Sequence, residues 1–113
     1  MSLELTQKKC EPCDAGTPPM KGGEVERYAT ELSDRWRVEE EHHLQGEFKF
    51  KNFMQALNFT NRVGELAEEE GHHPDICLTW GKASVKIYTH AIDGLSENDF
   101  ILAAKIDQVG LDV

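Results

Sequence analysis

Three of the five histidines in this chain are spaced so that they could share one proton-transfer site. His72 and His73 are adjacent, and His90 follows a later apolar run. Histidine is the side chain whose ordinary pKa lies near neutrality, so a neutral imidazole can accept a proton and a protonated one can donate it. These three residues are therefore the first candidates for chemistry, provided that the fold brings His90 back to the pair.

The elements around the histidines predict that return. A long helix should begin after Asn52, a good N-cap, and should end at Gly71, directly before the pair. Pro74 cannot continue a helix, and residues 75–80 alternate as a strand does. A tight turn at Gly81-Lys82 would start a returning strand over residues 83–89. Antiparallel pairing of the two strands then places His90 near the histidine pair.

Two kinds of chemistry fit three imidazoles. One is a mononuclear metal site, since three neutral imidazoles and a carboxylate suit zinc. Adjacent residues on an extended segment usually point apart, however, so His72 and His73 would not easily bind one ion. Acid–base catalysis is therefore favoured. Glu68, one helical turn before the pair, is expected either to orient His72 or to be a solvated residue on the helix surface.

The remainder of the chain completes an α+β domain. A short helix is predicted over residues 23–32, followed by strands at 36–38 and 44–50 that pair through a polar turn containing His42 and His43. Ser96 and Asp99 resemble a capping box at the start of the last helix. The predicted order is α-β-β-α-β-β-α, a four-stranded antiparallel sheet with helices packed on one face. The bare face and the edge strands suggest self-association.

Length, charge and cysteine content narrow the possible functions. The 113 residues suit one domain, and a formal charge of −9 disfavours direct binding to nucleic acid. No apolar run approaches the roughly 20 residues that span a bilayer, so no membrane association is expected. The absence of a signal-peptide pattern and the three cysteines favour the cytoplasm.

Residues 1–22 are predicted to form a flexible tail that precedes the domain at 23–113. The tail contains a CxxC pair, Cys10 and Cys13. No second ligand pair follows at a spacing typical of zinc sites, so an exposed, oxidisable segment is favoured over a metal site here.

The spacing Glu68-x3-His72-His73-Pro74-x5-Trp80-x9-His90-x8-Asp99 resembles the signature of the pterin-4a-carbinolamine dehydratases, and the likeness covers about residues 32–109. The resemblance implies a homodimer or homotetramer that removes water from a 4a-hydroxytetrahydropterin without metal or organic cofactor. The product would be the quinonoid dihydropterin, recycled for an aromatic amino-acid hydroxylase.

By the same resemblance, His72 and His90 form the acid–base pair, and His73 holds the pterin and shares in proton transfer. Which histidine is the acid is left open. The expected substrate-binding residues are Glu68, Pro74, Thr89, Ala91, Ile92 and Asp99. Trp80 is expected in either the core or the site. Gly71 departs from family members that carry an acidic residue there. The alternative function is a non-catalytic role in binding, assembly or dimerisation of a transcription factor.

Overall fold

The fold was analysed in a computed structural model that describes residues 5–11 and 16–111. The predicted order of helices and strands is confirmed, and two short 3-10 helices are added to it. In chain order the elements are η1 (Leu5–Gln7), α1 (Gly22–Ala29), β1 (Trp36–Glu39), β2 (His43–Lys49), α2 (Phe53–Glu70), β3 (Asp75–Thr79), β4 (Lys82–Ile87), η2 (His90–Ile92) and α3 (Glu97–Leu111).

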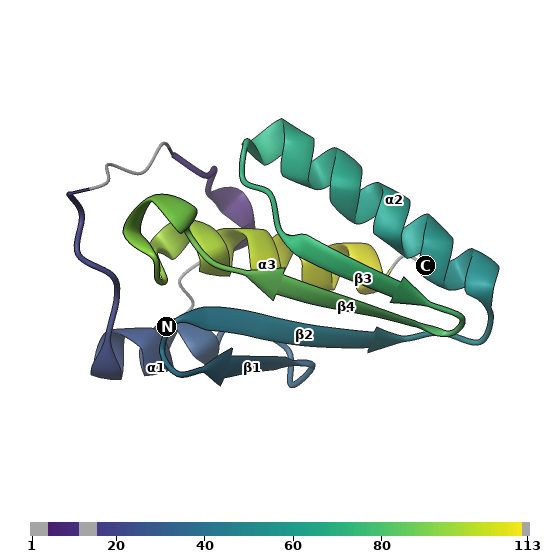
Figure 1. Ribbon diagram of the computed structural model, residues 1–113, viewed down its shortest axis with the longest axis horizontal. Helices are drawn as coiled ribbons and strands as arrows, with labels where there is room; N and C mark the ends of the chain where they lie inside the picture. Colours follow the sequence, from purple (N-terminus) through teal and green to yellow (C-terminus); the bar gives the residue numbers. More distant parts are fainter. Residues whose placement is uncertain (1–4, 12–15, 112–113) are drawn as a thin grey trace.

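The four strands form one antiparallel sheet in the order β1-β2-β4-β3 (Figure 1). The two hairpins therefore meet at the β2–β4 pairing, where Leu44 lies opposite Ile87 and Phe48 opposite Ala83. Alternate residues of β2 and β4 are buried, as expected for a sheet with one face in the core. Side chains on the other face, such as Glu47 and Lys86, are half-buried and polar.

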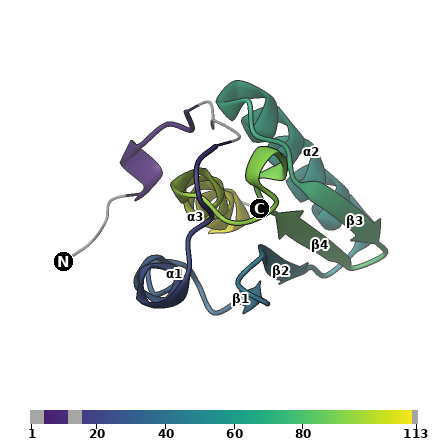
Figure 2. The same ribbon diagram turned by 60° about the vertical axis from the view of Figure 1, so that its left-hand side comes forward.

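The helices cover the buried face of the sheet. Residues of α2 and α3 join the strands in a single core, and α1 lies beside α3 (Figure 2). Phe59 of α2 is fully buried and packs against Phe48 of β2, with ring centroids 4.7 Å apart. Since the opposite face is polar, the prediction of self-association depends mainly on the unpaired edges of β1 and β3.

Both ends of α2 form as the sequence predicts. The Asn52 side chain accepts a hydrogen bond from the Gln55 N–H, so it caps the first turn. Gly71 ends the helix in the left-handed conformation with φ 65°. The N–H groups of Gly71 and His72 donate to Glu68 O and Ala67 O, which is the Schellman arrangement. This motif fixes the direction in which the chain leaves the helix.

Some predicted boundaries differ from the structure. The β3–β4 turn consists of Trp80 and Gly81, because Lys82 already pairs with Thr79. Trp80 is 69% exposed at this turn and lies neither in the core nor in the pocket that contains the histidines, so both positions expected for it were wrong. His43 belongs to β2 rather than to the turn before it.

The amino-terminal segment also differs from the predicted tail. Leu5 and Met20 are buried in the core, with 3% and 8% of their surface exposed. Two isolated apolar side chains produce no periodic pattern, which explains why the sequence resembles a tail here. Cys13 lies outside the described residues. None of the helices in the described ranges has the length and apolar character needed to cross a membrane.

Candidate active site

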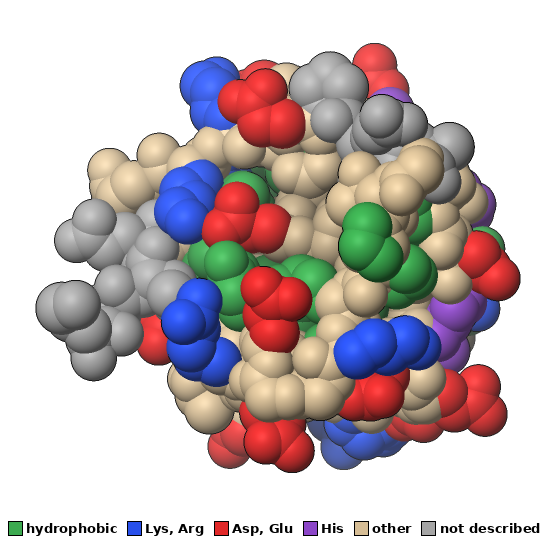
Figure 3. Space-filling model, turned by 90° about the vertical axis from the view of Figure 1, so that its left-hand side faces the viewer, with side chains coloured by type: hydrophobic (Ala, Val, Ile, Leu, Met, Phe, Trp, Pro, Cys, Tyr) green, Lys and Arg blue, Asp and Glu red, His purple; other side chains and the backbone are tan. Residues whose placement is uncertain are grey.

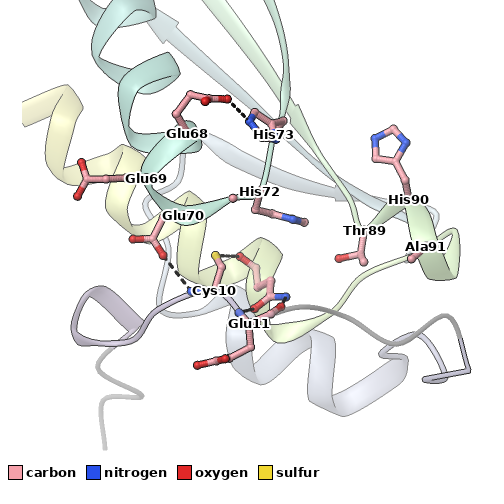
Figure 4. A pocket seen from close by; sticks show the side chains of 12 residues that line it. Cys10, Glu11, Glu68, Glu69, Glu70, His72, His73, Thr89, His90 and Ala91 are labelled. Carbon is pink, nitrogen blue, oxygen red and sulfur yellow. Dashed lines mark hydrogen bonds and ion pairs between the residues drawn. The ribbon is translucent and has the colours of Figure 1, made fainter.

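The three candidate histidines line one pocket of about 610 Å³ (Figure 4). His72 and His73 come from the α2–β3 connection, and His90 comes from the segment after β4. The hairpin thus returns the third imidazole to the pair, as strand pairing predicted. The pocket is lined by Cys10, Glu11, Glu68, Glu69, Glu70, Gly71, His72, His73, Thr89, His90, Ala91 and Asn98. Its volume is in the range usual for small-molecule sites.

His72 is held by a buried carboxylate. Its Nε2 lies 2.6 Å from Oδ1 of Asp99, whose side chain is fully buried. The second oxygen of Asp99 accepts hydrogen bonds from the Thr89 hydroxyl at 2.9 Å and from the Ser96 N–H at 2.8 Å. Asp99 therefore completes one half of the predicted capping box and also orients His72. A neutral His72 bound in this way carries its proton on Nε2 and leaves Nδ1 as an acceptor.

His73 has a carboxylate partner of its own. Its Nε2 lies 2.5 Å from Oε1 of Glu68, and both side chains are mostly exposed. The expectation that Glu68 would orient His72 is therefore wrong. The left-handed residue Gly71 breaks the helical spacing after Glu70, so position 72 no longer lies above position 68 and position 73 takes its place.

His90 occupies the opposite side of the pocket. It is exposed at the start of η2, and Thr89 before it is 4% exposed and pairs with Gly94 as an isolated bridge. Figure 4 shows the Thr89 side chain on the side of the pocket that faces His72. The site thus has imidazoles on both walls, with a buried carboxylate behind one of them.

The six expected substrate-binding residues fall into two groups. Glu68, Thr89 and Ala91 line the pocket, whereas Pro74, Ile92 and Asp99 do not. Ile92 is 9% exposed and belongs to the core. Asp99 acts from behind His72. Only the first three therefore lie where a molecule in the pocket could touch them.

Sequence reasoning missed one wall of the pocket, which the amino-terminal segment supplies. The Cys10 N–H donates to Glu70 Oε1, and its thiol lies 3.5 Å from Asn98 O. Glu11 and Asn98 exchange two hydrogen bonds, from Glu11 N–H to Oδ1 and from Nδ2 to Glu11 O. Burial, followed by the charge of Glu70, raises the pKa of Cys10 to about 12, so this wall presents a neutral thiol.

The pocket rim is acidic. Four of its described lining residues are glutamates, and no lysine or arginine is among them. Glu70 is bound by Lys105 at 2.7 Å, and its side chain is only 5% exposed. Burial alone would raise the pKa of Glu70, but hydrogen bonds from Lys105 and from the Cys10 N–H outweigh it and lower the pKa. Glu70 is therefore ionised, and the positive charge of Lys105 balances its negative charge.

No three His, Cys, Asp or Glu side chains within residues 5–11 and 16–111 are arranged to hold one metal ion. The two imidazoles at the α2–β3 connection bind separate carboxylates instead. An imidazole with one ring nitrogen hydrogen-bonded to a carboxylate keeps its other nitrogen for proton transfer.

Comparisons with known proteins identify relatives of this chain. Residues 18–109 match the model of the family described as pterin 4 alpha carbinolamine dehydratase. A relative from Alkaliphilus metalliredigens, provisionally named as a pterin-4-alpha-carbinolamine dehydratase, is 56% identical over 104 residues, covering 92% of this chain and 94% of the relative. One from Rubrobacter xylanophilus with the same provisional name is 57% identical, covering 94% and 98%.

Two solved structures share the fold. A transcriptional coactivator/pterin dehydratase from Brucella melitensis has a TM-score of 0.75 and 27% identity, covering 81% of this chain and 98% of its own. A pterin dehydratase-like protein, a RuBisCO assembly factor in the alpha-carboxysome, has a TM-score of 0.58, covering 66% and 88%. At 23% identity the latter shows the fold alone. This chain belongs to the pterin-4a-carbinolamine dehydratase family.

Proposed function

We propose that this protein removes water from a 4a-hydroxytetrahydropterin to give the quinonoid dihydropterin, with histidines as acid and base. One observation carries the proposal: His72, His73 and His90 line a single pocket, and two of them are hydrogen-bonded to carboxylates. Membership of the family supports the substrate class.

His72 is the proposed base. The reaction removes a proton from a ring nitrogen of the pterin. The hydroxyl group on C4a receives a proton, its bond to C4a breaks, and it leaves as water. Asp99 holds the Nε2 proton of His72, so Nδ1 is available to accept the substrate proton. The same carboxylate stabilises the imidazolium that results, as the aspartate does in a Ser-His-Asp triad.

His90 is the proposed acid. It lines the pocket on the side opposite His72, and within the described residues no carboxylate is bonded to its ring. A protonated imidazole without such a partner gives up its proton more readily than one that is paired with an anion. His73, turned by Glu68, contacts the pterin. After one turnover His72 carries the extra proton and His90 lacks one, and exchange with water restores both.

The first test is dehydration of a synthetic 4a-hydroxytetrahydropterin by the purified full-length chain with a chelator present. His72→Ala and His90→Ala should each reduce kcat about 10²- to 10⁴-fold, the usual contribution of a positioned acid or base. The melting temperature of each variant controls for folding. Unchanged kcat in both variants would overturn the mechanism.

The alternative is a non-catalytic assembly or dimerisation role on the same fold, which one structural relative is named for. A wild-type chain that leaves the pterin's decay rate unchanged would favour this alternative. We also infer a homodimer or homotetramer in the cytoplasm, supplying an aromatic amino-acid hydroxylase. Light scattering would test the assembly, because a monomer at working concentration would contradict it.

A further inference from the structure

The His90 ring is held differently from the other two imidazoles of the pocket. His72 and His73 are bonded to carboxylates, whereas within the described residues the ring of His90 has no hydrogen-bond partner. Its ring neighbour is Tyr88, stacked at a centroid distance of 4.2 Å and an interplanar angle of 24°. An exposed side chain without a hydrogen bond populates several rotamers unless such packing restricts it.

Tyr88 has a second aromatic neighbour, His42, at 4.6 Å between centroids. The Nε2 of His42 lies 2.7 Å from Oδ1 of Asp93. Asp93 ends the η2 turn that begins at His90, and its N–H donates to His90 O. The contacts therefore form a closed circuit, from His90 along the chain to Asp93, across to His42, through Tyr88 and back to His90. Figure 3 shows histidines and acidic side chains gathered along one edge of this end of the molecule.

Titratable and charged side chains lie around this circuit. The carboxylate of Asp93 accepts a hydrogen bond from His42 Nε2, and the Nδ1 of His42 lies 3.0 Å from the Nδ1 of His43. Burial, then the charges of Lys86 and His42, lower the pKa of His43, which is therefore neutral at pH 7. Lys86 Nζ also lies 5.6 Å from the centre of the Tyr88 ring, a cation–π distance. Glu39 and Glu40 oppose the effect of Lys86 on His43.

We propose that Tyr88 is a positioning residue for His90, and that His42 and Asp93 hold Tyr88 in place. This inference rests on the proposed function, in which His90 delivers a proton to the departing hydroxyl. Stacking against Tyr88 takes the place of the carboxylate that orients each of the other two imidazoles. It restricts the ring without adding an anion that would retain its proton. The effect should therefore appear in kcat rather than in KM.

The test compares Tyr88→Leu, which removes the ring, with Tyr88→Phe, which keeps it. We expect kcat of Tyr88→Leu to fall about 3- to 10-fold, the range available to one aromatic pair. Tyr88→Phe should restore kcat to within about twofold of wild type, because the stack does not use the hydroxyl. A Tyr88→Leu enzyme with wild-type kcat, or a Tyr88→Phe enzyme as slow as Tyr88→Leu, would overturn the inference.

A second pair of variants tests the far side of the circuit. Asp93 has φ 48°, a left-handed conformation that both Asn and Gly accept. Asp93→Asn keeps an oxygen for His42, whereas Asp93→Gly removes it. We expect Asp93→Gly to lower kcat, as Tyr88→Leu does. Asp93→Asn should lie nearer to wild type. Equal kcat values for the two variants would remove His42 and Asp93 from the proposal.

An NMR measurement on substrate-free protein separates this inference from the proposed reaction. Stacking on Tyr88 shifts the ring protons of His90 upfield, and we expect this shift in wild type and Tyr88→Phe but not in Tyr88→Leu. The same shift in Tyr88→Leu would show that the ring is not held by Tyr88. If wild type fails to dehydrate the pterin, the proposed function falls. If wild type is active and Tyr88→Leu matches it, only the positioning role falls.

Discussion

The two carboxylate oxygens of Asp99 bind different partners and have different roles. One oxygen accepts the N–H of Ser96 at the start of α3, together with the Thr89 hydroxyl, and the other binds Nε2 of His72. A fully buried carboxylate is costly unless it is well hydrogen-bonded, and three donors provide that compensation. The same residue thus links the beginning of a core helix to the orientation of a pocket imidazole.

Asp99→Asn should separate these two roles. The amide oxygen can still accept from Ser96 N–H, while the amide N–H₂ would face Nε2 of His72 and force its proton onto Nδ1. The proposed base would then be blocked in an otherwise folded protein. We expect kcat to fall about 10²- to 10⁴-fold, as happens when a triad carboxylate becomes an amide.

Steady-state rates together with the melting temperature measure this outcome. A loss of activity with a nearly unchanged melting temperature is expected. Activity within a few-fold of wild type would show that Asp99 has only a structural role.

The sequence identified the histidines but not all of their partners. Helical spacing pairs Glu68 with the residue four positions later, yet the carboxylate binds His73. The left-handed turn at Gly71 reverses the chain within one residue and rotates the side chains beyond it. Gly71 was recognised as a helix end, but the directions of those side chains depend on three-dimensional geometry that spacing alone does not contain.

At the scale of elements, a glycine inside α2 and the glycine that ends this helix provide a matched pair. Gly71 has φ 65°, and a Cβ there would meet no atom within 4 Å, so any effect of Gly71→Ala comes from backbone conformation. We expect this change to lower the free energy of unfolding by about 1–2 kcal/mol. Gly64, in the helix interior, has equally open surroundings, and Gly64→Ala should raise the free energy of unfolding by up to about 1 kcal/mol.

Urea unfolding of both variants measures whether each substitution lowers or raises the free energy of unfolding. Gly71→Ala should also reduce activity, because it moves the backbone that carries His72 and His73. Equal effects of the two substitutions on stability would contradict the assigned role of Gly71.

The amino-terminal segment is attached to α3 by charge and by burial of Leu5. Glu97 accepts hydrogen bonds from Lys8 Nζ and from the Tyr28 hydroxyl, and these lower the pKa of Glu97. A carboxyl whose pKa is lower in the folded state contributes stability above its ordinary pKa of about 4.3. This contribution is lost as the pH falls through the folded-state value.

Glu97→Gln should therefore destabilise the protein at about pH 6, and the difference from wild type should shrink as the pH falls through the folded-state pKa of Glu97. Lys8→Met should show the same pH window, because it removes the partner of the same carboxylate. Urea unfolding across this range measures the difference from wild type. A difference that persists undiminished at the acid end would contradict the role of this contact.

At the scale of the whole molecule, three phenylalanines join α2 to the sheet. Phe59 is fully buried, with ring centroids 4.7 Å from Phe48 and 5.1 Å from Phe50. Phe59→Ala should lower the free energy of unfolding by about 3–5 kcal/mol. Since small domains have about 5–15 kcal/mol in total, a large part of the stability depends on this contact.

Phe53→Ala is the matched control, because Phe53 begins the same helix but is 42% exposed. We expect a change within about 0.5 kcal/mol for that variant. Chemical denaturation of both proteins measures the contrast. Similar losses in the two would show that burial at position 59 is not what stabilises the α2–sheet contact.

The sequence by itself determined the order of elements, the faces of the strands and the ends of α2. These follow from local rules: alternation in β2 and β4, a capping side chain at Asn52 and a left-handed glycine at position 71. It also located the three imidazoles, because a two-stranded hairpin must return its end to its beginning.

Only the tertiary structure decided which carboxylate orients each histidine, that residues 5–11 form a wall of the pocket, and that Tyr88 lies between His42 and His90. Each of these features joins segments that are remote in the chain, or side chains whose directions depend on a non-repeating turn. Periodicity describes neighbours along one element. Contacts such as Asn98 with Glu11 arise only when separate elements pack on a common core.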